Sequence, residues 1–299
     1  TFSPLFVNGD NADGVTRVMK RVEEQFQLGA RVWPQVQTRP IDISFSFEVP
    51  SLLFMRLRGW YALLRFGSHA DVLAAFQDKD KRAALVAEAA PMERMWNRLI
   101  LRQVESERNQ QYVGKKLEDI AQERKQSVID TMIDLSVEEN LAAHFLAANM
   151  GHNNDERVSE LLAHPNVHIG ASDGGAHILS FATFGDTGYL LSQFVRETGL
   201  LDLEHAIKKI TMDTAKIWGM ENRGLIQNGY AADITIFDPD TIARGEEYFV
   251  QDVPGDGNRY VRDAIGIDTV IINGAIAYDS AAGYRDEHRG QILSGQARW

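Results

Sequence analysis

The residues best suited to chemistry lie in the segment 169–177, which reads IGASDGGAH. A short apolar strand here runs into a carboxylate, Asp173, and then into a pair of glycines. An Asp that ends a strand and precedes a glycine turn is presented at the rim of a sheet, where parallel α/β proteins keep their catalytic groups. The pattern therefore predicts a catalytic role for Asp173. The alternative is that its carboxylate caps the turn before a helix, because Asp readily accepts hydrogen bonds from turn amides.

Polar side chains also alternate at the end of a second strand. Gln35, Gln37 and Arg39 are spaced two apart, so they face the same way if the strand continues through them. A guanidinium at such a position could hold a substrate carboxylate through two parallel hydrogen bonds. We therefore place Gln37 and Arg39 among the substrate-binding candidates, with a salt bridge inside a loop as the alternative for Arg39.

Two histidines belong to the same group of candidates. His177 follows the glycine turn and could bind a metal ion or orient the attacking water, or could bond to the backbone at the strand end. His152 follows another strand, together with Asn153 and Asn154, and could line the pocket. The favoured interpretation of that triplet is a cap on the helix predicted over residues 155–164, because Asn is a preferred N-cap residue.

Composition excludes several classes of function. The 299 residues carry a formal net charge of -11, whereas nucleic-acid-binding proteins present a basic surface. The chain has no cysteine, which excludes thiol nucleophiles and agrees with a reducing compartment, so we expect a cytoplasmic protein. No apolar run approaches the roughly 18 residues of a membrane span. The absence of a glycine-rich phosphate loop and of a Gly-x-Ser-x-Gly motif argues against nucleotide-dependent and serine-nucleophile chemistry.

Alternating strands and helices must position these candidates. Strand-like runs are separated by helical patterns, which lie over residues 13–28, 116–125, 127–134 and 155–164. Such alternation predicts an α/β fold with a parallel sheet. Residues 50–94 form an insertion, and insertions of this size tend to cover the mouth of a barrel. Its stretch 51–66 (SLLFMRLRGWYALLRF) has the arginines and aromatics of an interfacial membrane helix, but an amphipathic cover over the mouth is favoured.

The pattern changes after a helical region over residues 188–219. Two short β runs, ADITIFDP at 232–239 and TVIING at 269–274, have turn residues between them. The second contains Asn273-Gly274, a strong signal for a tight hairpin. We place a domain boundary near Arg223, so that residues 1–222 form one domain and residues 223–299 form a small β subdomain with a tail.

Several segments together resemble the amidohydrolase superfamily, and within it most closely the N-acyl-D-amino-acid deacylase (D-aminoacylase) group. The C-terminal runs are NRGLI at 222–226, NGYAADI at 228–234, FDP at 237–239 and VIING at 270–274. The likeness also takes in SDGGAH at 172–177, LEHAIKKIT at 203–211 and YVGKKLEDIA at 112–121. It covers most of the chain from about Tyr112 onward.

The resemblance implies a partial (β/α)8 TIM barrel, made of its later strands, in a metal-dependent hydrolase of a linear C–N amide bond. Asp173 would end the last barrel strand, contact the metal and act as general base for a bound water. His177 would be a second ligand. The implied metal is zinc, and the implied substrate is a small N-acyl amino acid or related amide.

The histidines depart from the family pattern. Relatives carry a His-x-His pair on the first barrel strand, whereas this chain contains none. Because zinc needs three or four ligands, we expect most of them outside this chain, which would then be the C-terminal part of a longer protein. Half a barrel leaves open sheet edges, so we also expect a homo-oligomer or association with the missing N-terminal portion. The alternatives are a cyclic amidase similar to hydantoinase or dihydropyrimidinase, and a non-catalytic half-barrel subunit or fragment.

Overall fold

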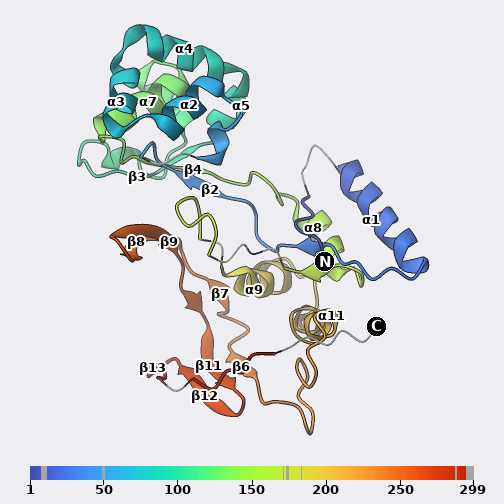
Figure 1. The fold of residues 1–299 in the computed structure, drawn as a ribbon. Coiled ribbons are helices and arrows are strands. Elements are labelled where there is room, and N and C mark those ends of the chain that lie inside the picture. Colours follow the sequence, from blue (N-terminus) through green and yellow to red (C-terminus); the bar gives the residue numbers. More distant parts are fainter. Residues whose placement is uncertain are drawn as a thin grey trace.

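Three regions of the chain are distinguishable in the computed structural model (Figure 1). A helical lobe is built from residues 43–147, a central part carries the only parallel strand pairing found in the described chain, and antiparallel strands follow from residue 234 onward. The structure describes residues 1–7, 12–48, 51–170, 172, 175–182, 184–286 and 288–293.

The central part begins with a β-α-β unit. Phe2 forms a parallel bridge with Pro34, and the amide of Leu5 donates to the carbonyl of Gln35 at 2.9 Å. Helix α1 (Ala12–Gln27) connects this first stretch to β1 (Gln35–Val36), and Gly29 ends the helical segment with a φ of 92°. Strand β1 pairs in parallel with β5 (His168–Ile169). The parallel arrangement predicted from the sequence is therefore present in this part of the chain.

The lobe contains a second sheet, and its strands are antiparallel. Its order is β2-β4-β3, from β2 (Ile43–Phe45), β3 (Ile100–Gln103) and β4 (His144–Ala147). The expectation that all strands before residue 222 would run parallel is wrong here. The apolar pattern of a strand determines which of its faces is buried, but it carries no information about the direction of its partner.

The helices of the lobe start where the sequence supplies capping side chains. Ser68 and Asp71 form a reciprocal capping box, and Asp78 and Ser127 accept hydrogen bonds from the first turn of their helices. These helices are α2 (Arg58–Phe66), α3 (His69–Gln77), α4 (Lys79–Ala89), α5 (Glu93–Trp96), α6 (Leu117–Arg124) and α7 (Val128–Glu138). Short 3-10 turns lie at Leu52–Phe54, Ala90–Met92 and Gln110–Tyr112.

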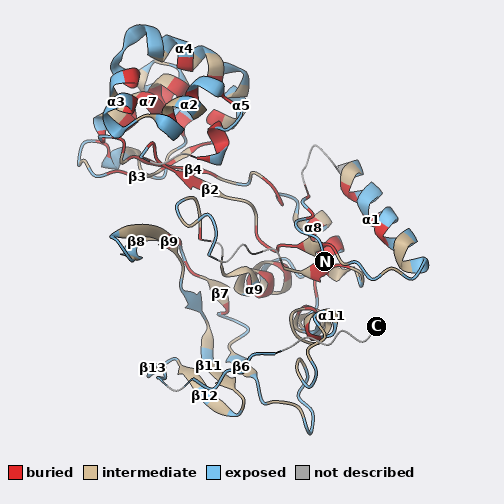
Figure 2. Cartoon of the chain, in the orientation of Figure 1, coloured by how far each residue is buried: buried red, intermediate tan, exposed pale blue. Residues whose placement is uncertain are grey.

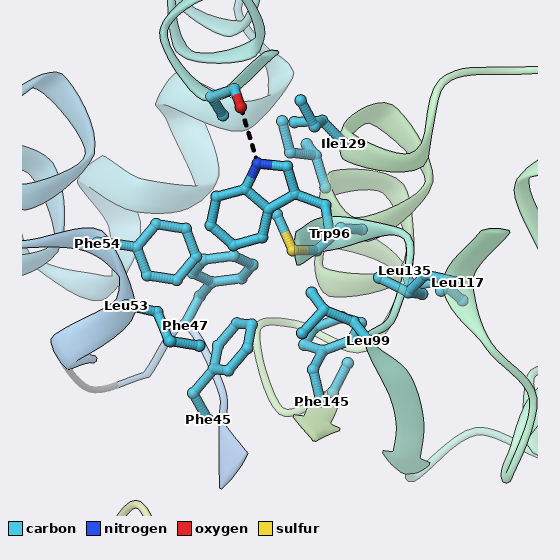
Figure 3. Packing of buried hydrophobic residues seen from close by; sticks show 14 of the residues in the cluster. Phe45, Phe47, Leu53, Phe54, Trp96, Leu99, Leu117, Ile129, Leu135 and Phe145 are labelled. Atoms are coloured by element: carbon cyan, nitrogen blue, oxygen red, sulfur yellow. Dashed lines mark hydrogen bonds between the residues drawn. The ribbon is translucent and has the colours of Figure 1, made fainter. Parts of the chain in front are cut away.

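The lobe has its own hydrophobic core (Figure 3). Phe54, Trp60 and Trp96 are fully buried, and Phe54 stacks on both indole rings. Each indole N–H finds a carbonyl, Trp60 at Leu85 (2.9 Å) and Trp96 at Ala89 (2.8 Å), as a buried Trp requires. Within residues 51–66, Leu53, Phe54, Leu57, Trp60 and Leu64 are buried in the core of the lobe, which argues against an interfacial membrane helix. That this segment covers the mouth of a barrel stays a prediction. Among the described helices there is none that combines the length and hydropathy of a bilayer span.

A second group of helices follows β4 and packs on the parallel pair. It contains α8 (Asp155–Ala163), α9 (Asp186–Tyr189), α10 (Leu203–Lys208) and α11 (Thr214–Ile217), with π-helical turns η5 (Leu190–Glu197) and η6 (Lys209–Asp213). A separate core joins these helices to α1 and β1 through Val36, Val158, Leu162 and Phe194, all almost fully buried.

The last part of the described chain is antiparallel β structure. A four-stranded sheet has the order β13-β12-β11-β6, from β6 (Ile234–Phe237), β11 (Ile267–Ile272), β12 (Ala275–Asp279) and β13 (Gly283–Tyr284). Asn273 and Gly274 make the predicted hairpin turn, with φ of 48° and 81°. Two more pairs are β7 (Ala243–Arg244) with β10 (Ala264–Ile265), and β8 (Tyr248–Val253) with β9 (Gly257–Val261). Figure 2 shows that burial is much sparser in this sheet than in the lobe.

Candidate functional site

The candidate site lies where the parallel strands end. Beyond β1 the chain continues through Thr38 to Arg39, and beyond β5 it continues to Ser172. A guanidinium nitrogen of Arg39, Nη2, donates to the carbonyl of Ser172 at 3.3 Å. The two strand ends named in the sequence prediction are therefore adjacent. Asp173, the predicted base, follows Ser172 directly but lies outside the described residues.

Arg39 is buried at this point, with only 3% of its surface exposed. Its Nε lies 3.5 Å from Oδ2 of Asp186, and its guanidinium lies over the ring of Phe181, 5.5 Å from the centroid. Gln37 donates from Nε2 to the carbonyl of Arg39 at 3.0 Å, so it supports the backbone that carries the arginine. Neither side chain opens to solvent in this conformation, and their role in binding a substrate stays a prediction.

Asp186 is a residue that the sequence analysis did not identify. It is the first residue of α9, and its carbonyl accepts the hydroxyl proton of Thr38 at 2.7 Å. Its Oδ1 also receives the amide of Thr38 at 3.4 Å, while Oδ2 faces Arg39. The carboxylate thus fixes the strand end at Thr38 and balances the buried guanidinium. No local sequence pattern marks the pairing of Thr38 with Asp186, because 148 positions separate these two residues.

His152 belongs to the same group of buried polar side chains. It is 1% exposed, its amide donates to the carbonyl of Val7 at 2.8 Å, and its ring meets that of Phe6 at 5.3 Å. Both ring nitrogens lack a hydrogen-bond partner in the structure as described. Burial, reinforced by the charge of Arg39, lowers the pKa of His152 to about 4, so the ring is neutral at pH 7.

The helix cap that the sequence suggested for this stretch is provided by Asn154. Its side-chain oxygen accepts the amide of Arg157 at 3.0 Å, at the start of α8. His152 therefore takes no part in this side-chain cap. The cap expected within the triplet is confirmed at Asn154, and the role of His152 in lining a pocket stays a prediction.

His177 lies in the loop 175–182 that follows the Asp173 turn. It is exposed, it has a φ of 56°, and its carbonyl accepts the amide of Ser180 at 2.7 Å. Its ring stacks on Phe181 at 5.4 Å, so Phe181 contacts both His177 and Arg39. The loop thereby connects two of the predicted site residues through one aromatic side chain.

The described residues do not by themselves fit a metal ion. Within the part of the chain that the structure describes, no group of three or more His, Cys, Asp or Glu side chains comes close enough to hold one. Of the two predicted ligands only His177 is described, and it is exposed on its loop.

Comparison with known proteins identifies the family. The model of the amidohydrolase family matches residues 56–278. The chain belongs to this family. Among its relatives is a D-aminoacylase of Alcaligenes xylosoxydans xylosoxydans, 29% identical over 185 residues, which cover 60% of this chain and 34% of that protein. An N-acyl-D-aspartate deacylase of the same organism is 31% identical over 143 residues, covering 46% of this chain and 26% of that protein.

A solved relative extends the likeness to nearly the whole chain. It is an N-acyl-D-glutamate deacylase from Bordetella bronchiseptica, complexed with zinc and a phosphonate mimic of the tetrahedral intermediate. The match has a TM-score of 0.51 and 20% sequence identity, and covers 96% of this chain and 48% of that one. This chain therefore shares a fold with that protein. Its similarity to the D-aminoacylase and to the N-acyl-D-aspartate deacylase agrees with the D-aminoacylase-like motifs of the sequence. The chain spans about a third or less of the length of the two curated relatives.

Proposed function

We propose that the whole protein hydrolyses a linear C–N amide bond in a small N-acyl amino acid, as a metal-dependent amidohydrolase of the D-aminoacylase type. The proposal is carried by one observation: in a member of this family, Arg39 binds the backbone at Ser172, one residue before Asp173 in the sequence. A guanidinium beside the segment that carries the proposed base suits a substrate with a carboxylate near the amide to be cleaved. The lack of cysteine agrees with a cytoplasmic location.

The proposed architecture is a partial (β/α)8 barrel. The stretch 1–7, β1 and β5 would be its later strands, since they run parallel and follow one another in space. Residues 1–222 would form the barrel domain with its inserted lobe, and residues 223–299 the small β subdomain. In such barrels the chemistry occurs at the carboxyl ends of the strands, where Arg39, His152 and Ser172 lie.

In the proposed reaction Asp173 removes a proton from the attacking water. Oxygen then bonds to the amide carbon, the C–N bond breaks, and the proton passes to the departing amine. Arg39 and Gln37 would hold the substrate carboxylate, and His177 would contact the substrate or the metal. A divalent metal, with zinc as the first candidate, would lower the pKa of the water; the proposal places most of its ligands outside this chain.

The test is a substrate panel on the full-length protein. We expect turnover of N-acyl-D-amino acids and none of cyclic ureides, which would be the substrates of a hydantoinase-like cyclic amidase. Asp173→Asn keeps the shape of the side chain but removes its basicity, so kcat should fall by about a hundredfold or more. Full activity of Asp173→Asn on every amide substrate would show that Asp173 is not the base. A protein that cleaves no C–N bond would support the non-catalytic alternative.

A further inference from the structure

A buried carboxylate outside the candidate site connects that site to the lobe. Glu247 lies between β7 and β8, and its side chain is 2% exposed. Its Oε1 receives Arg102 Nη1 at 2.8 Å and the hydroxyl of Ser44 at 3.3 Å. Its Oε2 receives Arg262 Nη2 at 3.1 Å and the backbone amide of Ala182 at 2.7 Å. Four separate segments of the chain therefore meet at one acidic side chain.

Two guanidinium groups share the one carboxylate of this cluster. Arg102 also donates from Nη2 to the carbonyl of Glu247 at 2.9 Å and from Nη1 to the hydroxyl of Ser44 at 3.1 Å. Arg262 donates from Nη1 to the carbonyl of Gly245 at 3.1 Å. An acid buried with a full set of charge-assisted donors has little freedom to move, and losing its charge leaves the donors without an ionised partner.

The same surroundings hold the loop 175–182 at two more points. The amide of Ser44 donates to the carbonyl of Ser180 at 2.6 Å, and the amide of Tyr260 donates to the carbonyl of Ile178 at 2.8 Å. With the bond from Ala182 to Glu247, alternate residues 178, 180 and 182 are each fixed to a different segment. Figure 1 shows this loop between the lobe and the β8–β9 hairpin.

Phe181 lies inside the stretch that is fixed in this way. Its neighbours Ser180 and Ala182 are both anchored, and its ring contacts His177 and the guanidinium of Arg39. A small displacement of the loop would therefore move the surface against which Arg39 rests. Displacements of about 1 Å remote from the chemistry can cost about a hundredfold in rate.

We propose that Glu247 is a positioning residue of the candidate site. It fixes the loop 175–182 through the amide of Ala182. Phe181 in turn supports the guanidinium of Arg39, which the proposed function assigns to the substrate carboxylate. The role of Arg39 rests on the proposed function, whereas the anchoring of the loop does not. Through Arg102 and Ser44 the same carboxylate couples the lobe to the site.

The test compares Glu247→Gln with Glu246→Gln in the full-length protein. Glu246 is the exposed neighbour of Glu247 and provides a matched control of identical chemistry. In Glu247→Gln we expect hydrogen exchange at the amide of Ala182 to accelerate about tenfold, because a charge-assisted bond becomes a weaker neutral one. Unchanged exchange in a folded Glu247→Gln protein overturns the proposal.

Kinetics separate positioning from a merely structural role. For an N-acyl-D-amino acid, Glu247→Gln should raise KM about tenfold with a smaller change in kcat, while an N-acyl amine without the carboxylate should show no change in KM. Equal losses on both substrates would refute action through Arg39. If the wild type cleaves neither substrate, the proposed function fails, and hydrogen exchange still decides the anchoring.

If Glu247→Gln does not fold, Arg102→Lys is the second variant for the hydrogen-exchange test. It keeps the positive charge and one bond to Glu247 but loses the second bond to the Glu247 carbonyl. A smaller acceleration at Ala182, of about two- to fivefold, is then expected. The proposal is abandoned if exchange at Ala182 is the same in Arg102→Lys as in the wild type.

Discussion

Two buried acids, Glu139 and Glu247, are each stabilised by donors to both carboxylate oxygens. Glu139, 4% exposed at the end of α7, receives the amides of Glu105 and Ser106, each at 2.8 Å. The side chains of Ser106 and Asn109 also donate to it. Burial acts to raise the pKa of Glu139, but the hydrogen bonds outweigh it and the pKa is lowered. The ionised carboxylate therefore fixes the loop after β3.

Replacing Glu139 tests this account. Glu139→Gln keeps the volume but presents an NH2 group to backbone donors, so we expect a loss of about 2 kcal/mol in the free energy of unfolding. Urea denaturation followed by tryptophan fluorescence measures it, since Trp60 and Trp96 are buried in the same lobe. Glu107→Gln, an exposed residue nearby, should cost almost nothing. Equal effects of the two substitutions would contradict the role of Glu139.

The sequence pointed to individual residues but not to their partners. It placed Arg39 and Asp173 at the ends of two strands, and the contact from Arg39 to Ser172 shows that the two segments are adjacent. It missed Asp186 and Glu247, because each acts on a residue far away along the chain, such as Glu247 on Arg102 across 145 positions. Such pairings depend on the tertiary fold, which no local pattern contains.

Helices and turns were predicted correctly where residues close together in the sequence determine them. The helix predicted at residues 13–28 is α1, and the Asn273-Gly274 hairpin joins β11 to β12. Capping side chains explain why α3 and α7 begin at their observed residues. The predicted parallel direction of β4 relative to β2 and β3 was wrong, since these strands are antiparallel. Strand direction is decided by connections and packing that lie outside the strand.

Two glycines between the C-terminal strands allow the cost of backbone strain to be measured apart from the cost of a side-chain clash. Gly266 and Gly274 both have positive φ, 74° and 81°. A Cβ at Gly266 would lie 2.6 Å from the amide nitrogen of Ile242, whereas a Cβ at Gly274 would meet nothing within 4 Å. Gly274→Ala should cost about 1 kcal/mol from the backbone alone, and Gly266→Ala roughly 3 kcal/mol or more. Thermal unfolding of both variants measures the difference, and similar losses would show that the clash is relieved by movement.

For the molecule as a whole, three buried histidines make stability sensitive to acid. Burial lowers the pKa of His144, His152 and His168 to about 4, with help from the charges of Arg102, Arg39 and Lys209, respectively. Between about pH 6.5 and 4 the unfolded chain binds protons at these sites and the folded chain does not. Stability is therefore complete above pH 6.5 and is lost as the pH falls, by on the order of 3 kcal/mol per histidine.

Urea unfolding between pH 7.5 and 4.5 measures this dependence. His168→Gln should flatten it, since glutamine can still accept the bond from the Trp218 indole but cannot be protonated. His177→Gln removes an exposed histidine and should leave the slope unchanged. An identical slope in the wild type and His168→Gln would argue against a neutral buried ring at this position.

Apolar side chains exposed beyond residue 222 favour association of the isolated chain. Ile226 and Tyr284 are 90% and 87% exposed and line an open cavity of about 1130 Å³ between the helices around η6 and the C-terminal sheet. Large apolar patches on a protein surface mark interaction sites or aggregation. Light scattering after size exclusion should show a concentration-dependent rise in mass. Ile226→Ser with Tyr284→Ser should reduce it, whereas Leu28→Ser, at an 80% exposed site just after α1, should not. A monomer at every concentration would contradict this prediction.

The pairing of β2 with β4 has a consequence for how such a chain can change. Ile43 lies opposite Ala147, so the lobe begins and ends at adjacent points, and its core is closed within itself. The cost of joining two neighbouring points grows only slowly with the length of chain between them. The lobe can therefore be lengthened, shortened or exchanged while the parallel strands stay as they are. An exchanged lobe must keep the serine and the arginine that meet the carboxylate of Glu247, and the histidine of β4 that meets the hydroxyl of Tyr260.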